Sequence, residues 1–480
     1  MPSATTSEPR VLIVGFGRHA QRVYWPVLDH LALAGRARLV GIVDLAAESG
    51  PVSDRIVSAE VGLTPFLAAD AEAIDPDLDN YVNRIRPDVV MICTDPEVHV
   101  LYAKWALRRG LHVLVDKPVH MVPGAAHSSA VAQQIHDGYL DLLQVLRAER
   151  KKKPNLVCSV LAQRRFHPSF RIVRETIEDV YRQVECPVTY YYSFHSDGQW
   201  RLPGEIDRIS YHGFNRGYGK GAHSGYHFFD LLNWLTEPYR DNCNVNSLTV
   251  DSWGNFPTNY AAQVSERSLR RTLGPTVASR ETLDDGPWGL GEIDLLSRVQ
   301  LKSGSSVVTN ATVDLLHSGL SARSWEHIGA RDLYKGNGRL RHETMYLNMG
   351  PFASISVSSL QGEEFQPEKD IWDDEAGVGH ELHLDVHVFR NHELIGGDAV
   401  TTHRIADQYS PALQGQSRGH QEDARRLGIL EFVGLVTAGS RDSDSDLESH
   451  GVSSQLMSLA YQSLSNGAAV TDNLFSRERS

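Results

Sequence analysis

A single stretch near the N-terminus, residues 10–44, constrains the fold of this 480-residue chain more than any other. It contains a short apolar run, a glycine-rich turn, a segment that can form a helix and a second apolar run. The turn reads Gly15-Phe16-Gly17-Arg18-His19-Ala20, and the second run ends in Asp44. This order of strand, turn, helix, strand and acid predicts the first βαβ unit of a parallel sheet.

The small residues of the turn are those that a bound dinucleotide requires. Gly15 permits the sharp turn, Gly17 lets the backbone approach a pyrophosphate, and Ala20 lets the helix pack close to the strand. The helix N-terminus offers free N–H groups and a partial positive charge to phosphates. Asp44 can accept hydrogen bonds from the adenosine ribose, and no Arg or Lys follows it closely. The pattern predicts NAD, with NADP less favoured, although Arg18 could reach a phosphate; the alternative is a glycine turn in some other α/β fold.

The alternation of apolar runs and helical segments continues to residue 162. Residues 87–93, 112–115 and 156–161 are typical of strands buried on both faces. We therefore expect a doubly wound parallel sheet, a Rossmann domain, over residues 8–162. Ligands of such sheets bind beyond the carboxyl ends of the strands. The polar residues at such ends are Thr94, Asp95, Asp116 and Lys117.

The character of the sequence changes after residue 162. Alternating apolar and polar residues between 244 and 405 predict strands and hairpins, and helical patterns precede and follow them. This predicts a second, α+β domain over residues 163–480, built on a large, mostly antiparallel sheet. Insertions are expected around 256–289 and 350–420. The helices are expected at 169–184, 221–235, 421–436 and 447–466.

Composition excludes several classes of partner. The net charge of -13 argues against nucleic acid and anionic membranes. The first ten residues lack the apolar core of a signal peptide, and no apolar run approaches the ~18 residues that span a bilayer. The four cysteines show no close pairing, which favours a reducing, cytoplasmic setting.

Three motifs together resemble the glucose–fructose oxidoreductase, inositol dehydrogenase and rhizopine catabolism family (Gfo/Idh/MocA). They are the glycine turn with Asp44; Thr94-Asp95-Pro96-Glu97-Val98-His99 followed by Asp116-Lys117-Pro118; and His223-Ser224-Gly225-Tyr226-His227-Phe228-Phe229-Asp230. The segment Arg164 to Pro168 also resembles the family's sequence after its last Rossmann strand. Here Asp95 replaces the usual Pro, Asp116 the usual Glu, and His223 the usual Asp that pairs with the catalytic His.

The resemblance implies hydride transfer between a nicotinamide and a carbinol carbon of a sugar or cyclitol. Lys117, at a strand end, could hydrogen-bond the reacting oxygen, and His227 has an ordinary pKa suited to acid–base work. His223 and Asp230 complete the predicted catalytic set, and Asp230 could orient the His227 ring, bind a hydroxyl or be purely structural. The residues expected to bind the cofactor are Gly15, Phe16, Gly17, Arg18, His19, Asp44, Thr94, Asp95, His99, Asp116 and Lys117.

Other interpretations remain open at the level of sequence. His223 and His227, or His383, Asp385 and His387, could ligate a metal, but hydride transfer to a nicotinamide requires none and no metal is expected. Some relatives are glycosidases that hold NAD, oxidise the sugar transiently and eliminate the aglycone. A third alternative is a non-catalytic NAD-binding protein, which would need neither Lys117 nor His227. The resemblance also implies a homodimer or homotetramer formed through an open face of the second sheet.

Overall fold

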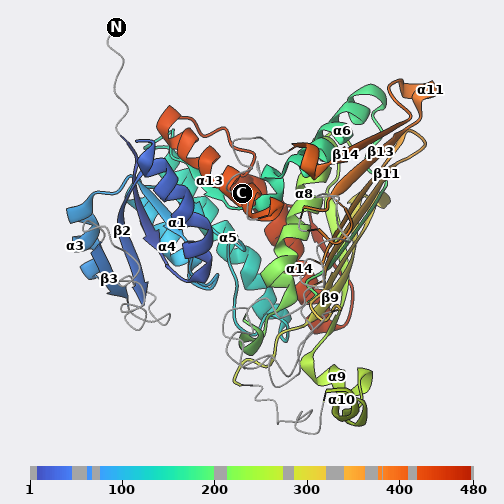
Figure 1. Ribbon diagram of the computed structural model, residues 1–480, viewed down its shortest axis with the longest axis horizontal. Coiled ribbons are helices and arrows are strands. Elements are labelled where there is room, and N and C mark those ends of the chain that lie inside the picture. The colour runs from blue at the N-terminus through green and yellow to red at the C-terminus, as the bar shows by residue number, and fades with distance from the viewer. Residues whose placement is uncertain are drawn as a thin grey trace.

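The computed structural model describes most of the chain and contains two β-sheets that face each other across a layer of helices (Figure 1). The described residues are 8–45, 62–66, 76–198, 213–273, 286–320, 340–362, 377–380, 382–408 and 419–476. The predicted insertions around 256–289 and 350–420 lie partly outside these ranges. None of the helices within them is both long and apolar enough to cross a membrane.

The first sheet is the predicted Rossmann sheet. Its six described strands are all parallel, in the order β3-β2-β1-β4-β5-β6. The inner strands β4 and β5 are buried at every position, which explains why their sequences are continuous apolar runs. The strands are β1 (Arg10–Val14), β2 (Arg38–Leu45), β3 (Gly62–Phe66), β4 (Val89–Ile92), β5 (His112–Val115) and β6 (Cys158–Val160).

Helices cover both faces of this sheet. One face packs against α3 (Pro76–Ile85), α4 (His99–Arg108) and α5 (Ser129–Arg150). The other packs against α1 (Arg18–Leu33), which contains Pro26 as expected, and against α13 (His420–Ala438). The last of these comes from the C-terminal part of the chain, where the sequence placed it in the second domain. Residues 420–438 thus complete the core of the first sheet (Figure 1).

The second sheet is large and mostly antiparallel, as predicted. Its nine described strands have the order β14-β13-β12-β11-β7-β10-β9-β8-β15, and only β7 and β10 pair in parallel. The predicted hairpin around Gly304 is formed by β9 and β10. The strands are β7 (Tyr190–Ser196), β8 (Ser247–Asn255), β9 (Asp294–Ser303), β10 (Ser306–Leu316), β11 (Arg341–Met349), β12 (Ala353–Gln361), β13 (Asp385–Arg390), β14 (Val400–Arg404) and β15 (Val470–Asn473).

Among the described residues, helices pack on the face of the second sheet that is turned towards the first sheet (Figure 1). The helices α6 (Pro168–Val184), α8 (Tyr226–Arg240) and α14 (Gly451–Asn466) pack there against the buried alternate residues of the strands. The short helices α9 (Tyr260–Gln263), α10 (Glu266–Leu273) and α11 (His392–Ile395) lie at its ends. The opposite face exposes large apolar side chains, among them Tyr190, Trp253, Tyr346 and Phe389.

One predicted helix differs in form. The segment expected to be a continuous α-helix over residues 221–235 begins with a π-helical turn, Gly221–Gly225, and continues as α8. A π-helical turn holds more residues than an α-helical turn. His227 and Asp230 are buried, whereas His223 is partly exposed.

Candidate active site

The glycine turn has the geometry that its sequence predicts. Gly15 has a φ of +83°, and a Cβ placed there would lie 2.8 Å from the backbone nitrogen and the methyl group of Thr94. Gly17 precedes α1 without a side-chain cap, and a Cβ on it would meet no atom within 4 Å. The Phe16 N–H donates to Asp44 Oδ2 at 2.8 Å, so the acid lies directly beside the turn. The turn thus leaves open space over the helix N-terminus, next to a carboxylate.

The carboxyl ends of β4 and β5 are tied together behind this turn. His99 bridges two backbone carbonyls, with Nδ1 at 2.8 Å from Pro118 O and Nε2 at 2.9 Å from Thr94 O. A neutral imidazole can donate to only one of them. The Lys117–Pro118 peptide bond is cis. His99 therefore fixes the position of the two strand ends, consistent with a role in supporting the cofactor turn.

Asp116 is ionised by its surroundings. Burial would raise its pKa, but His19, whose Nε2 lies 2.9 Å from Oδ2, and the neighbouring Lys117 hold the pKa of this carboxyl well below its usual range. The Lys117 N–H donates to Asp116 Oδ1 at 2.8 Å. Two predicted cofactor residues, His19 and Asp116, are thus brought into contact.

The turn after β4 also contacts a residue that sequence reasoning missed. Arg216 Nη1 lies 2.9 Å from Glu97 Oε1 and 3.5 Å from Asp95 Oδ2. The Tyr218 hydroxyl donates to the same Glu97 oxygen at 2.7 Å. Arg216 lies between β7 and the π-helical turn in the chain, and nothing in the sequence pairs it with Asp95.

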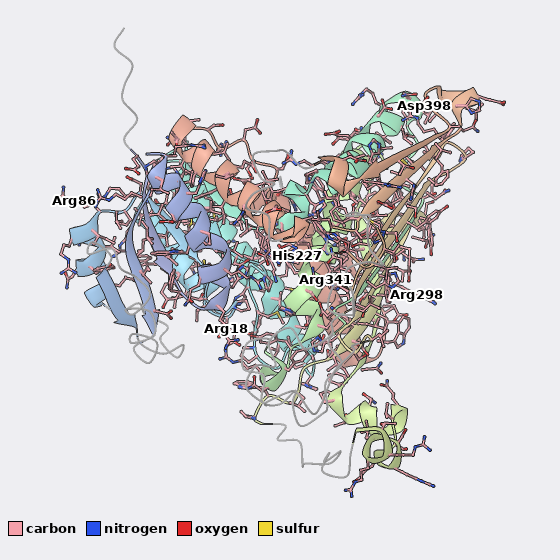
Figure 2. The ribbon with its side chains drawn as sticks, viewed as in Figure 1. Arg18, Arg86, His227, Arg298, Arg341 and Asp398 are labelled. Carbon is pink, nitrogen blue, oxygen red and sulfur yellow. The ribbon has the colours of Figure 1, made fainter. Side chains whose placement is uncertain are left out.

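Lys117 contacts the turn that precedes His227. Lys117 Nζ donates to the backbone carbonyl of His223 at 2.5 Å, which joins the end of β5 to the π-helical turn before α8. Burial lowers the pKa of Lys117 to about 8, so the amine gains or loses its proton near neutral pH. Figure 2 shows His227 in this central region, between the first sheet and Arg341 on β11.

His227 itself is 4% exposed. Burial, followed by repulsion from Lys117, Arg164 and Arg425, holds its pKa well below the ordinary value. Its Nδ1 is buried without a hydrogen-bond partner in the described part of the chain. The ring is therefore neutral at neutral pH and can accept a proton.

The π-helical turn is held by residues far away in sequence. Glu292 Oε1 accepts from the Gly221 N–H at 2.7 Å and from the Tyr461 hydroxyl at 2.7 Å, and that hydroxyl lies 3.0 Å from the Ala222 nitrogen. Glu292 is fully buried, which raises its pKa to about 7. Just before the turn, the buried Lys220 forms an ion pair with Asp197 at the end of β7. Together these contacts hold in place the backbone carbonyl of His223, which accepts the hydrogen bond from Lys117.

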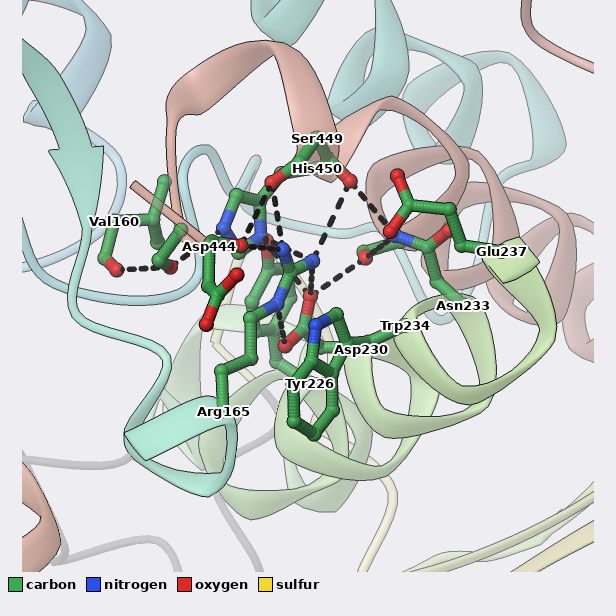
Figure 3. Close-up of polar contacts among 12 residues, drawn as sticks. Val160, Arg165, Tyr226, Asp230, Asn233, Trp234, Glu237, Asp444, Ser449 and His450 are labelled. Atoms are coloured by element: carbon green, nitrogen blue, oxygen red, sulfur yellow. Dashed lines mark hydrogen bonds and ion pairs between the residues drawn. The ribbon is translucent and has the colours of Figure 1, made fainter. Parts of the chain in front are cut away.

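Asp230 lies in a different cluster from the Lys117–His227 pair (Figure 3). Its carboxylate accepts from Arg165 Nε at 2.9 Å and from Arg165 Nη2 at 2.6 Å. It also lies 3.0 Å from His450 Nδ1 and accepts from Ser453 Oγ at 2.7 Å. The side chains of Asp230 and Arg165 are 1% and 0% exposed. Both oxygens are thus used to join α8 to the segment after β6 and to the start of α14, which favours the structural alternative for Asp230.

The same cluster contains Ser445, whose hydroxyl lies 2.9 Å from His450 Nε2. A serine, a histidine and an aspartate in this order form the arrangement of a hydrolytic triad. However, Ser445 Oγ donates to the Val160 carbonyl at 2.6 Å, and all three side chains are buried. The serine therefore bonds the backbone and faces no solvent.

No group of three metal-ligating side chains able to hold an ion is formed by the described residues. His383, one of the strand histidines considered above, accepts from the Leu360 N–H at 2.7 Å through Nδ1. His387 lies between the buried Val386 and Val388, on the opposite face of β13, and contacts Thr402 instead.

These features define a class: a Rossmann dinucleotide-binding fold joined to a large sheet that is open on one face. Residues 9–137 match the family model described as "Oxidoreductase family, NAD-binding Rossmann fold" (GFO_IDH_MocA). The match confirms, over these residues, the resemblance to the Gfo/Idh/MocA family that the first two motifs carry. Comparison of the sequence with curated proteins found no match.

Several solved structures are similar over nearly the whole chain. The apo scyllo-inositol dehydrogenase from Lactobacillus casei has a TM-score of 0.54 and 15% identity, covering 98% of this chain and 99% of that one. The WlbA dehydrogenase from Bordetella pertussis in complex with NADH and UDP-GlcNAcA has a TM-score of 0.56, 15% identity and coverages of 98% and 100%. An oxidoreductase from Agrobacterium radiobacter in complex with NAD+, L-tartaric acid and magnesium has a TM-score of 0.56, 11% identity and coverages of 96% and 98%. The chain therefore shares the fold of these solved structures.

Proposed function

We propose that this protein is an NAD-dependent oxidoreductase that transfers hydride between nicotinamide and a secondary alcohol or ketone of a sugar, amino sugar or cyclitol. The observation that carries the proposal is the contact of Lys117 Nζ with the His223 carbonyl. This contact sets the amine at the end of β5, where ligands of a doubly wound sheet bind, and next to the turn that precedes His227.

The residues around the glycine turn suit a dinucleotide. A Cβ would fill the space at Gly15, whereas Gly17 leaves the N-terminus of α1 open to a pyrophosphate. Asp44 presents its carboxylate beside the turn, where it can bind ribose hydroxyls and would repel a 2′-phosphate. We therefore propose NAD rather than NADP. The predicted contributions of Arg18, His19, Thr94 and Asp95 to binding belong to this proposal.

The bound nicotinamide would supply or accept the hydride. Lys117 uses one N–H on the His223 carbonyl and keeps two to hydrogen-bond the reacting oxygen and stabilise its negative charge. His227, neutral because burial and nearby cations lower its pKa, takes the hydroxyl proton during oxidation and returns it during reduction. His223 contributes its backbone carbonyl, and in this proposal its imidazole replaces the acid that usually accompanies the histidine.

The first test is a titration with NAD and NADP separately, followed by turnover assays against a panel of sugars and inositols. We expect binding of NAD, and turnover that is lost in Lys117→Ala and His227→Ala. Lys152→Ala, a change at an exposed lysine paired with Glu149, is the matched control. It should leave NAD binding and turnover unchanged. Failure to bind either dinucleotide would contradict the proposal at its first step.

The two other functions give different results in the same assay. An NAD-retaining glycoside hydrolase would release an aglycone from a glycoside without net NADH. A non-catalytic NAD-binding protein would bind NAD but tolerate Lys117→Ala and His227→Ala with no loss of any activity.

We also propose that the chain forms a homodimer or homotetramer through the uncovered face of the second sheet. The apolar side chains on this face support it, since Trp253 is 50% exposed and Phe389 is 44% exposed.

A further inference from the structure

Glu292 caps the start of the π-helical turn twice. The first N–H groups of a helix have no acceptor within the helix and need one from elsewhere. The Lys220 N–H donates to the backbone carbonyl of Glu292 at 2.9 Å, and the Gly221 N–H donates to its carboxylate oxygen Oε1 at 2.7 Å. The Glu292 side chain is fully buried. One residue, 71 positions after Gly221, therefore holds two of the N–H groups that begin this turn.

Tyr461 holds the third. Its hydroxyl oxygen accepts from the Ala222 N–H at 3.0 Å, and its hydroxyl hydrogen is donated to Glu292 Oε1 at 2.7 Å. Tyr461 lies on α14, which packs against α8 in the helix layer (Figure 1). The next N–H, that of His223, donates to the Gly219 carbonyl at 2.9 Å within the turn. Glu292 and Tyr461 thus supply the acceptors that the helix itself cannot provide.

The turn also lies directly against the second sheet at both of its ends. A Cβ on Gly221 would lie 2.8 Å from a methyl group of Leu295 on β9, and a Cβ on Gly225 would lie 2.5 Å from a methyl group of Leu315 on β10. The two ends are therefore fixed in place by packing. The caps determine the backbone conformation between them.

The His223 carbonyl is the group through which this turn reaches Lys117. The amine of a lysine sits on a flexible stem of four carbons, and a hydrogen bond to a fixed acceptor restricts its rotamers. Lys117 Nζ donates to this carbonyl at 2.5 Å. The position of the carbonyl therefore decides where the two remaining N–H groups of the ammonium point. A reacting group displaced by about 1 Å can cost a factor of about 100 in rate.

We propose that Glu292 and Tyr461 are positioning residues for Lys117: by capping the π-helical turn, they hold the His223 carbonyl that directs the amine towards the reacting oxygen. The inference rests on the proposed oxidoreductase function and adds two residues that act through the turn rather than on the substrate. Only Ala222 and His223 separate the Tyr461 hydroxyl from the Lys117 amine along this chain of hydrogen bonds.

The variants remove the acceptors while keeping the size of the side chains. Tyr461→Phe removes the hydroxyl, and Glu292→Met removes the carboxylate. Glu292→Gln keeps an acceptor at Oε1 and places its amide nitrogen at Oε2, which has no hydrogen-bond partner among the described residues. Tyr239→Phe, at the other end of α8, is the matched control, because it also removes a buried hydroxyl, one that lies 2.9 Å from Thr309 Oγ1.

The first measurement is turnover with NAD, together with the dissociation constant of NAD. Tyr461→Phe and Glu292→Met should lower kcat by about 10- to 100-fold and leave NAD binding unchanged, because the amine moves while the glycine turn does not. Glu292→Gln should retain most of the activity, and Tyr239→Phe should retain all of it. If Glu292→Met does not fold, Tyr461→Phe, the smaller change, decides the outcome.

The second measurement does not depend on turnover. The pKa of Lys117 is obtained from the pH dependence of its acylation by acetic anhydride, followed by mass spectrometry. A carbonyl acceptor favours the ammonium form, so this pKa, about 8 in the wild-type protein, should fall in Tyr461→Phe and Glu292→Met. A general loosening that lets water reach the amine would instead raise it towards its ordinary value. All variants keep the charged side chains that shift this pKa: Asp116, Arg164, Arg425 and Asp197.

The inference is overturned if Tyr461→Phe leaves both kcat and the pKa of Lys117 unchanged, if this pKa rises, or if Tyr239→Phe lowers kcat as much. Its failure is distinguishable from that of the proposed function. Turnover that requires Lys117 but tolerates Tyr461→Phe would keep the oxidoreductase and remove the positioning role. A lowered pKa of Lys117 in a protein that shows no turnover with NAD would do the reverse.

Discussion

Lys117 is the ionisable group that most directly controls the proposed reaction. Burial lowers its pKa to about 8, so it carries a proton below this pH and loses it above. Because the protonated amine is the hydrogen-bond donor to the reacting oxygen, we expect kcat to fall above about pH 8. The pKa of His227 is well below 6.5, so any fall in kcat on the acidic side of the pH–rate profile should occur below pH 6.5. A pH–rate profile checks this, and Lys117→Arg should remove the alkaline limb while lowering kcat, because Arg keeps its charge. A rate that rises through pH 8 would instead make the neutral amine the base.

Asp230 provides a second prediction at the level of the residue. Asp230→Asn leaves the buried Arg165 without its counter-ion, which should lower the free energy of unfolding by about 3–5 kcal/mol. Denaturant unfolding measures this, with Asp137→Asn on the exposed side of α5 as the control, since that aspartate accepts a hydrogen bond from the nearby Gln133 side chain. A variant of normal stability that has lost kcat would show that Asp230 acts in catalysis after all.

Individual residues also show what the sequence could reveal. Gly15, Asp44 and Lys117 stand at the ends of short, strongly patterned strands, so local sequence was enough to place them. Asp230 was recognised but its partner was not, because Arg165 is paired to it by tertiary packing.

Among the elements, the glycine turn after β1 allows a direct test of cofactor binding. Gly15→Ala forces a Cβ to within 2.8 Å of Thr94 in a backbone region that L-residues avoid. We expect at least a tenfold loss of NAD affinity, roughly 1.4 kcal/mol or more. Gly35→Ala is the matched control, because Gly35 also has a positive φ but no neighbour within 4 Å. Equal affinities in the two variants would contradict the assignment of the turn.

The π-helical turn makes stability depend on pH through Glu292. Its pKa is raised from 4.5 to about 7 in the folded protein by burial, so the folded state binds a proton more tightly than the unfolded state. The stabilisation is complete below about pH 4.5 and is lost as the pH rises to about 7, at up to about 1.4 kcal/mol per pH unit. We expect Glu292→Gln to remove this slope in unfolding experiments between pH 5 and 8. A slope unchanged by the substitution would contradict the raised pKa.

The form of this turn was not predictable from the pattern of apolar residues. The periodicity of residues 221–235 is helical, but the extra residue per turn comes from contacts with Glu292 and Tyr461. Both lie on distant elements. Helical periodicity thus predicted the element, while tertiary hydrogen bonds decided its type.

At the scale of the whole molecule, the uncovered sheet face predicts self-association. Tyr346, on β11, is 39% exposed at the centre of this face. A buried charge there should disrupt an apolar interface, so Tyr346→Glu is expected to convert the wild-type oligomer into a monomer in light scattering after size exclusion. Leu33→Glu, at an 86% exposed position of α1, serves as the control. A monomeric wild-type protein would contradict the proposed assembly.

The path of α13 has a consequence for how the protein is made. Its residues Ile429, Phe432 and Val433 pack with Leu114, Val157 and Leu161 of the first sheet, and Gly428 allows a close approach to Leu161. The sheet strands leave the ribosome long before this helix does, by on the order of tens of seconds at about 5–20 residues per second. During that time an apolar strip of the nascent sheet lacks its cover. Chains arrested before residue 420 should therefore bind hydrophobic dyes and chaperones more strongly than chains arrested after α13 has emerged, and synthesis of the last part of the polypeptide completes the fold of the first.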